Sequence, residues 1–169
     1  MKIKQSVCFP IFRNDKSDMD KLFKSIACLG FAAVEFWYRD DEFKDIVRYA
    51  HKHGLVVAGI CGHHTLGDGL NKRSNHDRIE MELKESIDLA ARNQIPGLIC
   101  FSGNGQPHQT DEDAIDAVVD GFKRIAPYAE KKGINLNMEL LNSKVNHPGY
   151  QCDHTSWGVT VCEKVNSPR

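Results

Sequence analysis

Polar residues stand where several apolar stretches of the sequence end, and Glu139 has the clearest chemical potential among them. It lies within NLNMELLN, where a carboxylate is costly to bury without a metal ion or hydrogen-bond partners. A salt-bridged structural glutamate explains the position equally well. The other candidates of this kind are Glu35, His63, His64, Ser102 and Asn104.

Two short clusters contain residue types that bind metal ions. His63 and His64 follow Cys61 within CGHHTLGDG, and the segment 152–154 reads Cys-Asp-His. Adjacent residues on a strand point to opposite faces, so the paired histidines do not suit one ion. We therefore expect one histidine to face a cavity and the other to pack outside it. The second cluster lacks further ligands at the spacing of a structural zinc site.

Lys144 and His147 occur together in NSKVNHPGY, after the stretch that contains Glu139. From this loop they would reach over a cavity and contact the carboxylate or hydroxyl of a small anionic substrate, as would His63. A solvated lysine and a capping histidine remain the alternative. Trp37 and Phe101, with Tyr38, are either apolar walls of the cavity or core aromatics.

The elements that would position these residues alternate regularly between strand and helix. Apolar runs predict strands, and apolar residues at helical spacing predict the helices between them. Three joints, LGFAAVEF, HGLVVAGI and KGINLNMEL, share a glycine that ends a helix before a strand. The predicted strands are 3–9, 33–37, 55–61, 97–101 and 134–140, and the predicted helices are 18–29, 41–53, 76–92, 110–132 and 155–165.

The loops after the strands are longer and more polar than the glycine joints before them. This asymmetry is typical of a (β/α)8 TIM barrel, in which the loops after the strands carry the chemistry. An open doubly wound sheet also alternates strand and helix, but no GxGxxG follows the first strand. We expect one incomplete TIM-barrel domain over residues 1–169, an α/β fold that stops after about five βα units.

Composition narrows the class of partner. Lys and Arg number 22 and Asp and Glu 23, a net charge of −1 that gives no electrostatic basis for binding nucleic acid or an acidic membrane. No apolar run approaches the roughly 20 residues of a membrane helix, and the N-terminus does not resemble a signal peptide. The six cysteines form no CxxC pair, which favours reduced thiols and a cytoplasmic location.

The segment MELLNSKVNHPGYQCDHTSWGV closely resembles the corresponding segment of the hydroxypyruvate isomerases. These enzymes belong to the xylose isomerase-like (sugar phosphate isomerase/epimerase) TIM barrels. GFAAVEFW, HGLVVAGI and PGLICFSGN also match the group, so the resemblance covers essentially the whole chain. The ELLNSKVNHPGYQCDH run is the specific part, and the other matches are general to the superfamily.

The resemblance implies an aldose-ketose isomerisation between hydroxypyruvate and tartronate semialdehyde through an enediolate. Two carboxylates would move the proton, and a divalent cation, Mg²⁺ or Mn²⁺, would polarise the oxygens. In this group the cation is held by a glutamate on the fifth strand and by residues on the sixth, seventh and eighth strands. Glu139 matches the first of these, as metal ligand and as one half of the acid-base pair.

The later ligands have no counterparts, because the sequence ends where a sixth strand would begin and barrels of this type have roughly 250 residues. We therefore expect little or no isomerase activity from the chain alone, and homo-oligomerisation through its exposed sheet edges. A non-catalytic isoform that pairs with a full-length subunit is the alternative. A metal-dependent endonuclease, found in the same barrel group, is disfavoured by the lack of a basic stripe.

Overall fold

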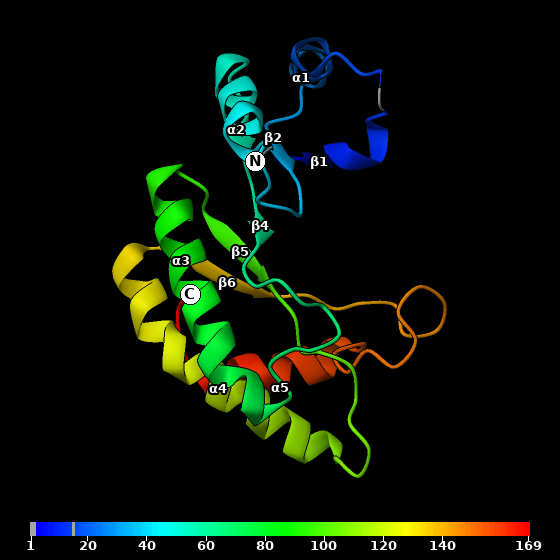
Figure 1. Cartoon of the computed structure of the whole chain (residues 1–169), viewed down its shortest axis with the longest axis vertical. Coiled ribbons are helices and arrows are strands. Elements are labelled where there is room, and N and C mark those ends of the chain that lie inside the picture. Colours follow the sequence, from blue (N-terminus) through cyan, green and yellow to red (C-terminus); the bar gives the residue numbers. More distant parts are fainter. Residues whose placement is uncertain (1–2, 15) are drawn as a thin grey trace.

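The computed structural model describes residues 3–14 and 16–169, and it shows parallel strands that alternate with helices (Figure 1). Most of the predicted elements are confirmed within one to three residues at either end. The strands are β1 (Ser6–Cys8), β2 (Ala33–Glu35), β3 (Val56–Val57), β4 (Ile60–Cys61), β5 (Gly97–Cys100) and β6 (Asn135–Met138). The helices are α1 (Met19–Cys28), α2 (Phe43–Lys52), α3 (His76–Arg92), α4 (Asp111–Lys132) and α5 (Thr155–Val165), with 3-10 turns η1 (Phe9–Phe12) and η2 (Arg73–Asn75).

The predicted third strand, 55–61, is not one continuous strand as expected, because it divides into β3 and β4. β3 pairs with β2 in the order β1-β2-β3, and β4 pairs with β5 in the order β4-β5-β6. Twisted strands that curve around a barrel are staggered, so each end of a strand meets a different neighbour. The Ala58 N–H still donates to the Val34 carbonyl (2.8 Å), so the chain stays beside β2 between the two halves.

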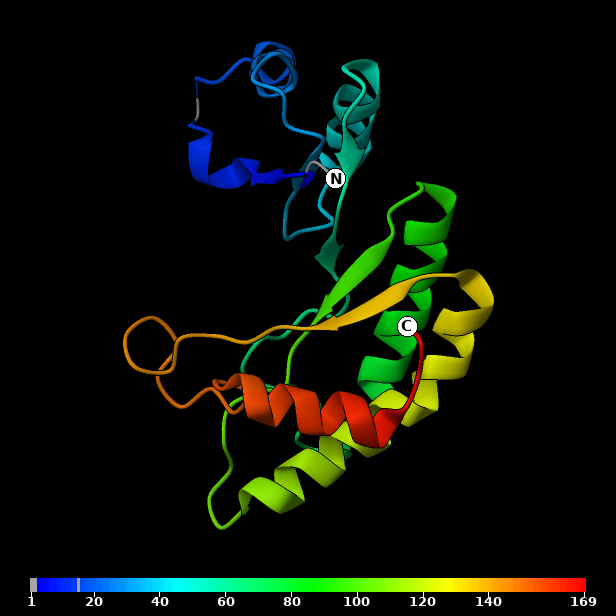
Figure 2. The ribbon, with the colours of Figure 1, turned by 180° about the vertical axis from the view of Figure 1, so that it is seen from behind.

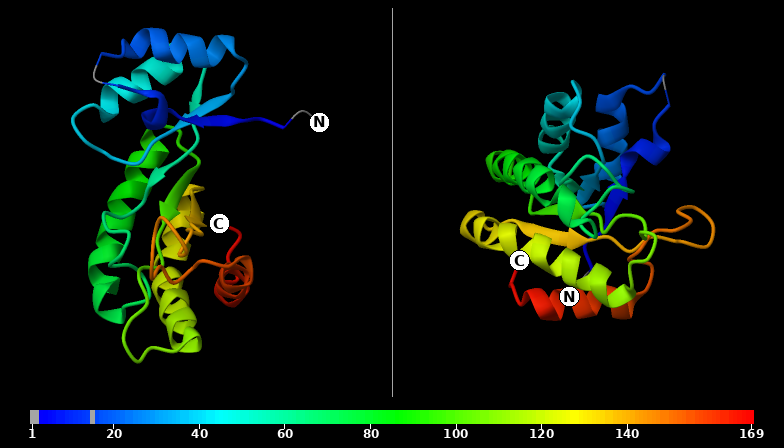
Figure 3. Two further views of the ribbon diagram at one scale, coloured as in Figure 1. Left: turned by 90° about the vertical axis from the view of Figure 1, so that its right-hand side faces the viewer. Right: turned by 60° about the horizontal axis from the view of Figure 1, so that its bottom comes forward.

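The helices form a layer outside the strands, as Figures 2 and 3 show. α4 packs between α3 and α5, and α1 lies against α2. The apolar residues at helical spacing pack inward, and in α3 Ile79, Leu83, Ile87 and Ala90 are fully buried. These helices therefore anchor the strands whose carboxyl ends carry the candidate site.

The ends of the helices follow the expected local chemistry. Thr110 caps α4, because its hydroxyl accepts from the Asp113 N–H (3.1 Å) while the Asp113 carboxylate accepts from the Thr110 N–H (3.3 Å). Gly133 ends α4 with φ of +71°, and Gly54 adopts φ of +72° after α2. A side chain would be strained at such angles, which explains the glycine joints in the sequence.

Each of the two three-stranded sheets has two edge strands in the described part of the chain, and the inner edges, β3 and β4, belong to one stretch of chain. β1 is one edge of the strand order and β6 is the other. The C-terminal segment returns beside β6, where the Leu136 N–H donates to the Arg169 carbonyl (3.4 Å) and Arg169 Nη1 donates to Asn135 Oδ1 (3.3 Å). Edge β1 remains available for pairing, and the β6 edge is partly covered.

Candidate functional site

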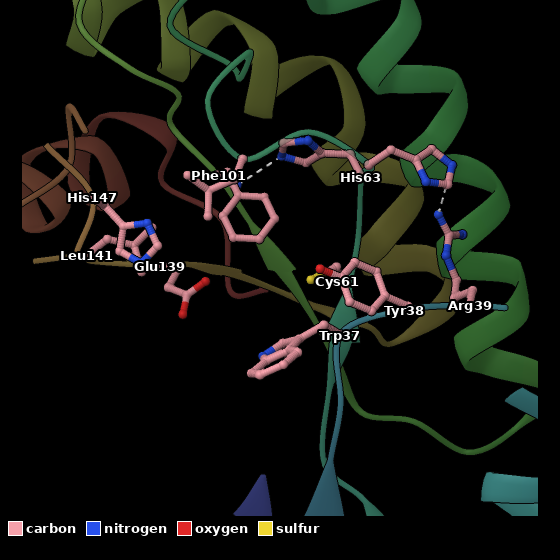
Figure 4. Close-up of a pocket in the computed structure, with 11 residues that line it drawn as sticks. Trp37, Tyr38, Arg39, Cys61, His63, Phe101, Glu139, Leu141 and His147 are labelled. Atoms are coloured by element: carbon pink, nitrogen blue, oxygen red, sulfur yellow. Dashed lines mark hydrogen bonds between the residues drawn. The ribbon is translucent and has the colours of Figure 1, made fainter. Parts of the chain in front are cut away.

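A cavity of about 450 Å³ opens at the carboxyl ends of the strands (Figure 4). Its walls come from the segments after β2, β4, β5 and β6, the places where the sequence predicted chemistry. It is lined by Trp37, Tyr38, Arg39, Cys61, His63, His64, Leu66, Phe101, Glu139, Leu141 and His147. Aromatic and aliphatic walls with a few polar groups are typical of a small-molecule site.

Glu139 directly follows β6 and is held by its backbone. Its N–H donates to the Cys100 carbonyl (3.0 Å), which continues the pairing of β6 with β5. Its carbonyl accepts from the Tyr150 hydroxyl (3.1 Å). The side chain is half-buried and lies beside His147 in the cavity (Figure 4). Backbone contacts on both sides therefore fix where this carboxylate can act.

The environment of Glu139 favours its protonated form. Burial raises the pKa of the Glu139 carboxyl, the nearby His147 opposes that shift, and the carboxylate of Glu35 adds to it. Within the described residues no side chain forms a hydrogen bond or an ion pair with the Glu139 carboxylate. The structural alternative, a salt-bridged glutamate, is therefore wrong for these residues. A raised pKa and a free carboxylate in a cavity suit proton transfer.

His63 is almost completely buried, with 1% of its surface exposed. Its Nε2 accepts from the Phe101 N–H (2.9 Å), so the proton of the neutral ring lies on Nδ1. That Nδ1 has no partner in the described structure. Burial lowers the pKa of His63 to about 4, so the ring is neutral near pH 7. His63 therefore adds a neutral ring in edge-on contact with Phe101, its Nδ1 is buried, and its contact with a substrate stays a prediction.

His64 also lines the cavity, so the expectation that only one of the paired histidines would face it is wrong. Both lie in a bend after β4, where the strict alternation of a strand no longer applies. His64 Nε2 lies 3.4 Å from Arg39 Nη2. The His64 N–H donates to Glu82 Oε2 (2.9 Å), which ties the bend to α3.

Lys144 and His147 separate in the structure. His147 lines the cavity, and its N–H donates to the Asn142 carbonyl (2.9 Å). Lys144 is exposed in the same loop, with its N–H bound to Asn142 Oδ1 (2.9 Å), and it is not among the lining residues. His147 thus has the expected position, and the substrate contact of Lys144 stays a prediction.

Three of the polar residues expected at the cavity serve other contacts. Ser102 is fully buried, and its Oγ accepts from the Cys152 N–H (3.1 Å). Glu35 accepts from the Ser6 hydroxyl (2.5 Å), and Asn104 is exposed and pairs in an isolated bridge with Tyr150. None of the three is among the residues that line the cavity.

Tyr150 and Cys152 hold the loop after β6 in one conformation. Both are buried, and the Tyr150 hydroxyl accepts from the Ser102 N–H (3.0 Å) while it donates to Glu139. The Leu141 N–H donates to the Cys152 carbonyl (3.2 Å). Sequence reasoning did not single out Tyr150. The only signal was a large aromatic residue after a proline and a glycine within an otherwise polar loop.

Arg39 and Cys61 complete the polar lining, and Arg39 was not predicted from the sequence. Burial raises the pKa of Cys61 to about 11, with Glu139 adding to the shift, so this thiol is protonated and a poor nucleophile. Arg39 stands in WYRDD, four residues after the end of β2, and this placement near a strand end is the signal that could have found it.

No group of three or more His, Cys, Asp or Glu side chains in the described structure is arranged to hold a metal ion. In the 152–154 cluster, Cys152 is buried and Asp153 contacts both His154 and the Ser143 hydroxyl. Glu139 offers one unpaired carboxylate, whereas hard divalent cations take six or more oxygen ligands. The described residues alone therefore do not fit a cation site.

The family model for the xylose isomerase-like TIM barrel matches residues 23–169. The chain belongs to this family. Its parallel strands, outer helices and cavity at the strand ends are the corresponding part of such a barrel. No curated protein matches the chain. None of the helices described is long and apolar enough to cross a membrane.

Several solved structures share this fold. A D-psicose 3-epimerase studied with D-fructose superposes with a TM-score of 0.73 at 19% identity, covering 98% of this chain and 61% of that one. An AP endonuclease of family 2 from Brucella melitensis gives 0.69 at 23%, covering 91% and 61%. An L-ribulose 3-epimerase gives 0.73 at 20%, covering 96% and 57%. The chain thus spans about three fifths of the length of these barrels, and at such identities the likeness shows the fold alone.

Proposed function

We propose that this chain carries part of the active site of a hydroxypyruvate isomerase-type enzyme, with Glu139 as one acid-base residue. The observation that supports it is the half-buried Glu139 carboxylate, which has a raised pKa and no side-chain partner among the residues described and lines a 450 Å³ cavity. A small hydroxy-keto acid or sugar fits a cavity of that size. The sequence ELLNSKVNHPGYQCDH supports hydroxypyruvate in particular.

The proposed reaction moves two protons, one between the two carbons and one between their oxygens, and no heavier atom. The Glu139 carboxylate takes a proton from the hydroxymethyl carbon of hydroxypyruvate, and the bonding electrons form the carbon-carbon double bond of an enediolate. The former ketone oxygen gains the negative charge. Delivery of a proton to the neighbouring carbon, with transfer of the hydroxyl proton of the former hydroxymethyl group to the former ketone oxygen, gives tartronate semialdehyde. His147 beside Glu139, and the buried neutral His63, would hold substrate oxygens during these steps, with Lys144 above them.

A divalent cation, Mg²⁺ or Mn²⁺, belongs to this proposal only for an assembly that brings further oxygen ligands to Glu139. There the Glu139 carboxylate would be one ligand, and the cation would supply Lewis-acid polarisation of the substrate oxygens. We assign no step to the cation here, because the described residues do not complete its ligand set.

We further propose that the 169-residue chain alone turns hydroxypyruvate over slowly, if at all. One carboxylate can take the proton, but it stands on one side of the substrate. The described residues therefore supply no second acid-base group to deliver a proton to the neighbouring carbon. Self-association through the β1 edge would support the alternative, a non-catalytic subunit that pairs with itself or with a longer chain. The six free cysteines and the net charge of −1 support a cytoplasmic protein that binds neither nucleic acid nor membranes.

The test is an assay of product formation from hydroxypyruvate, with and without Mg²⁺ or Mn²⁺, beside D-fructose and D-psicose. We expect slow formation of tartronate semialdehyde and no change in the two ketohexoses. Epimerisation of a ketohexose without any reaction of hydroxypyruvate would show that hydroxypyruvate is the wrong substrate. It would remain consistent with proton transfer by Glu139. Salt-dependent binding of DNA would instead favour the endonuclease.

A further inference from the structure

Figure 4 shows a cationic side chain across the cavity from Glu139. Arg39 lies on one side, and Glu139 lies on the other with His147, while Trp37 stands between them in this view. His64 is close to Arg39. Arg39 is half-buried, and it follows β2 while Glu139 follows β6. A small molecule in this cavity therefore meets a carboxylate from one side and a guanidinium from the other.

The guanidinium of Arg39 is held in place by two contacts that leave some of its N–H donors unused. Its Nη1 donates to Ser86 Oγ (2.6 Å), and Ser86 is itself buried and bound to the Gly62 carbonyl (2.5 Å). Its Nη2 lies 3.4 Å from His64 Nε2. A guanidinium has about five N–H donors in a fixed plane. These two contacts leave most of them for a ligand, with the geometry already fixed by α3 and the bend after β4.

The charge of Arg39 is not neutralised by a direct ion pair with the described residues. Burial lowers the pKa of Arg39, and the carboxylates of Glu85 and Glu82 on α3 oppose that shift without forming an ion pair with the guanidinium. Glu82 is already bound to Arg78 (2.9 Å) and to the His64 N–H. An arginine keeps its charge at any physiological pH. A half-buried cation with free donors is a strong recognition group for a planar carboxylate.

We propose that Arg39 binds the carboxylate of the substrate, so that the cavity selects a small hydroxy-keto acid over a neutral sugar. This rests on the proposed function in one respect: Glu139 acts on the other end of the same molecule. The planar guanidinium can pair with a carboxylate through two parallel hydrogen bonds, which also aligns the substrate across the cavity. Arg39 is thus a specificity-determining residue.

Three probes with the same hydroxymethyl ketone head test the proposal. Hydroxypyruvate carries a carboxylate, dihydroxyacetone is its neutral counterpart, and dihydroxyacetone phosphate carries a phosphate. Their dissociation constants are measured by calorimetry with the 169-residue chain, with Arg39→Gln and Arg39→Lys, and with Lys24→Gln as a control. Lys24 is an exposed cation on α1, outside the cavity, so its loss changes the net charge alone. Circular dichroism checks that each variant is folded.

We expect Arg39→Gln to bind hydroxypyruvate about tenfold more weakly than the parent chain does, and Arg39→Lys to have an intermediate dissociation constant. Dihydroxyacetone should bind within about twofold of the parent in every variant, and Lys24→Gln should change nothing. Equal binding of hydroxypyruvate to Arg39→Gln, or an equal loss of dihydroxyacetone, would overturn the proposal. If Arg39→Gln weakens the binding of dihydroxyacetone phosphate more than that of hydroxypyruvate, the preferred group is a phosphate and the proposed carboxylate is wrong.

Binding without turnover separates this proposal from proton transfer by Glu139. Glu139→Gln should keep the Arg39-dependent preference for hydroxypyruvate even where it removes all chemistry. If that preference is missing while the parent chain exchanges the substrate proton, the Arg39 proposal fails alone. If the preference is present and no exchange occurs, the role of Glu139 fails alone.

Discussion

Removing the hydroxyl of Tyr150 should loosen the loop that positions Glu139. The hydroxyl accepts from the Ser102 N–H (3.0 Å) and donates to the Glu139 carbonyl (3.1 Å), so it joins the ends of β5 and β6. Tyr150 is 2% exposed and Ser102 is fully buried. Burial raises the pKa of Tyr150, so the phenol stays protonated and its donor is present at every practical pH.

The magnitude follows from the buried donor that Tyr150→Phe leaves behind. The phenyl ring keeps the packing, while the Ser102 N–H loses its partner in a site without water access. An unsatisfied buried group costs about 1–3 kcal/mol of unfolding free energy. We expect a destabilisation of about 1–3 kcal/mol.

Urea unfolding of the 169-residue chain measures this loss, read as a lower midpoint with an unchanged slope. Tyr38→Phe is the matched control, because Tyr38 is 71% exposed. It should change the free energy by less than about 0.5 kcal/mol. The reasoning is refuted if Tyr150→Phe is as mild as the control, or if it acts only by changing the slope.

Three further predictions concern stability and assembly. Burial lowers the pKa of His63 to about 4 in the folded chain, so between about pH 6.5 and pH 4 the unfolded chain binds one more proton than the folded chain. The free energy of unfolding should therefore fall as the pH falls through this range, by up to about 3 kcal/mol. In His63→Gln, urea unfolding should show a weaker dependence of stability on pH, and an unchanged dependence would contradict the prediction. Thr110→Ala should cost about 1 kcal/mol in urea unfolding by removing the α4 cap, and a neutral result would exclude the capping box as a stabilising contact. The open β1 edge predicts concentration-dependent association in sedimentation velocity, and a monomer at all concentrations would contradict it.

The sequence predicted those parts of the fold that local chemistry determines. The α3 face of Ile79, Leu83 and Ile87, and the α4 cap at Thr110, needed only helical spacing and one capping pair. The division of strand 55–61 was missed, because it depends on which neighbour each half meets in a curved sheet.

The candidate site was predicted in part. Glu139 and His147 follow an apolar strand and so fall at its polar end. Arg39 and Tyr150 were missed, because their roles come from partners far along the chain, Ser86 for one and Ser102 for the other. Ser102 looked like a site residue, yet burial turned its hydroxyl to the Cys152 backbone.

The central claim is that the Glu139 carboxylate removes a proton from the hydroxymethyl carbon of hydroxypyruvate. Proton NMR in D₂O measures exchange at that carbon and does not require the complete isomerisation. We predict that the parent chain exchanges this proton faster than buffer alone and that Glu139→Gln does not. Because burial raises the pKa of Glu139, the exchange rate should rise with pH above the usual range for a carboxyl group. Equal exchange by the parent chain, Glu139→Gln and buffer alone would contradict the claim.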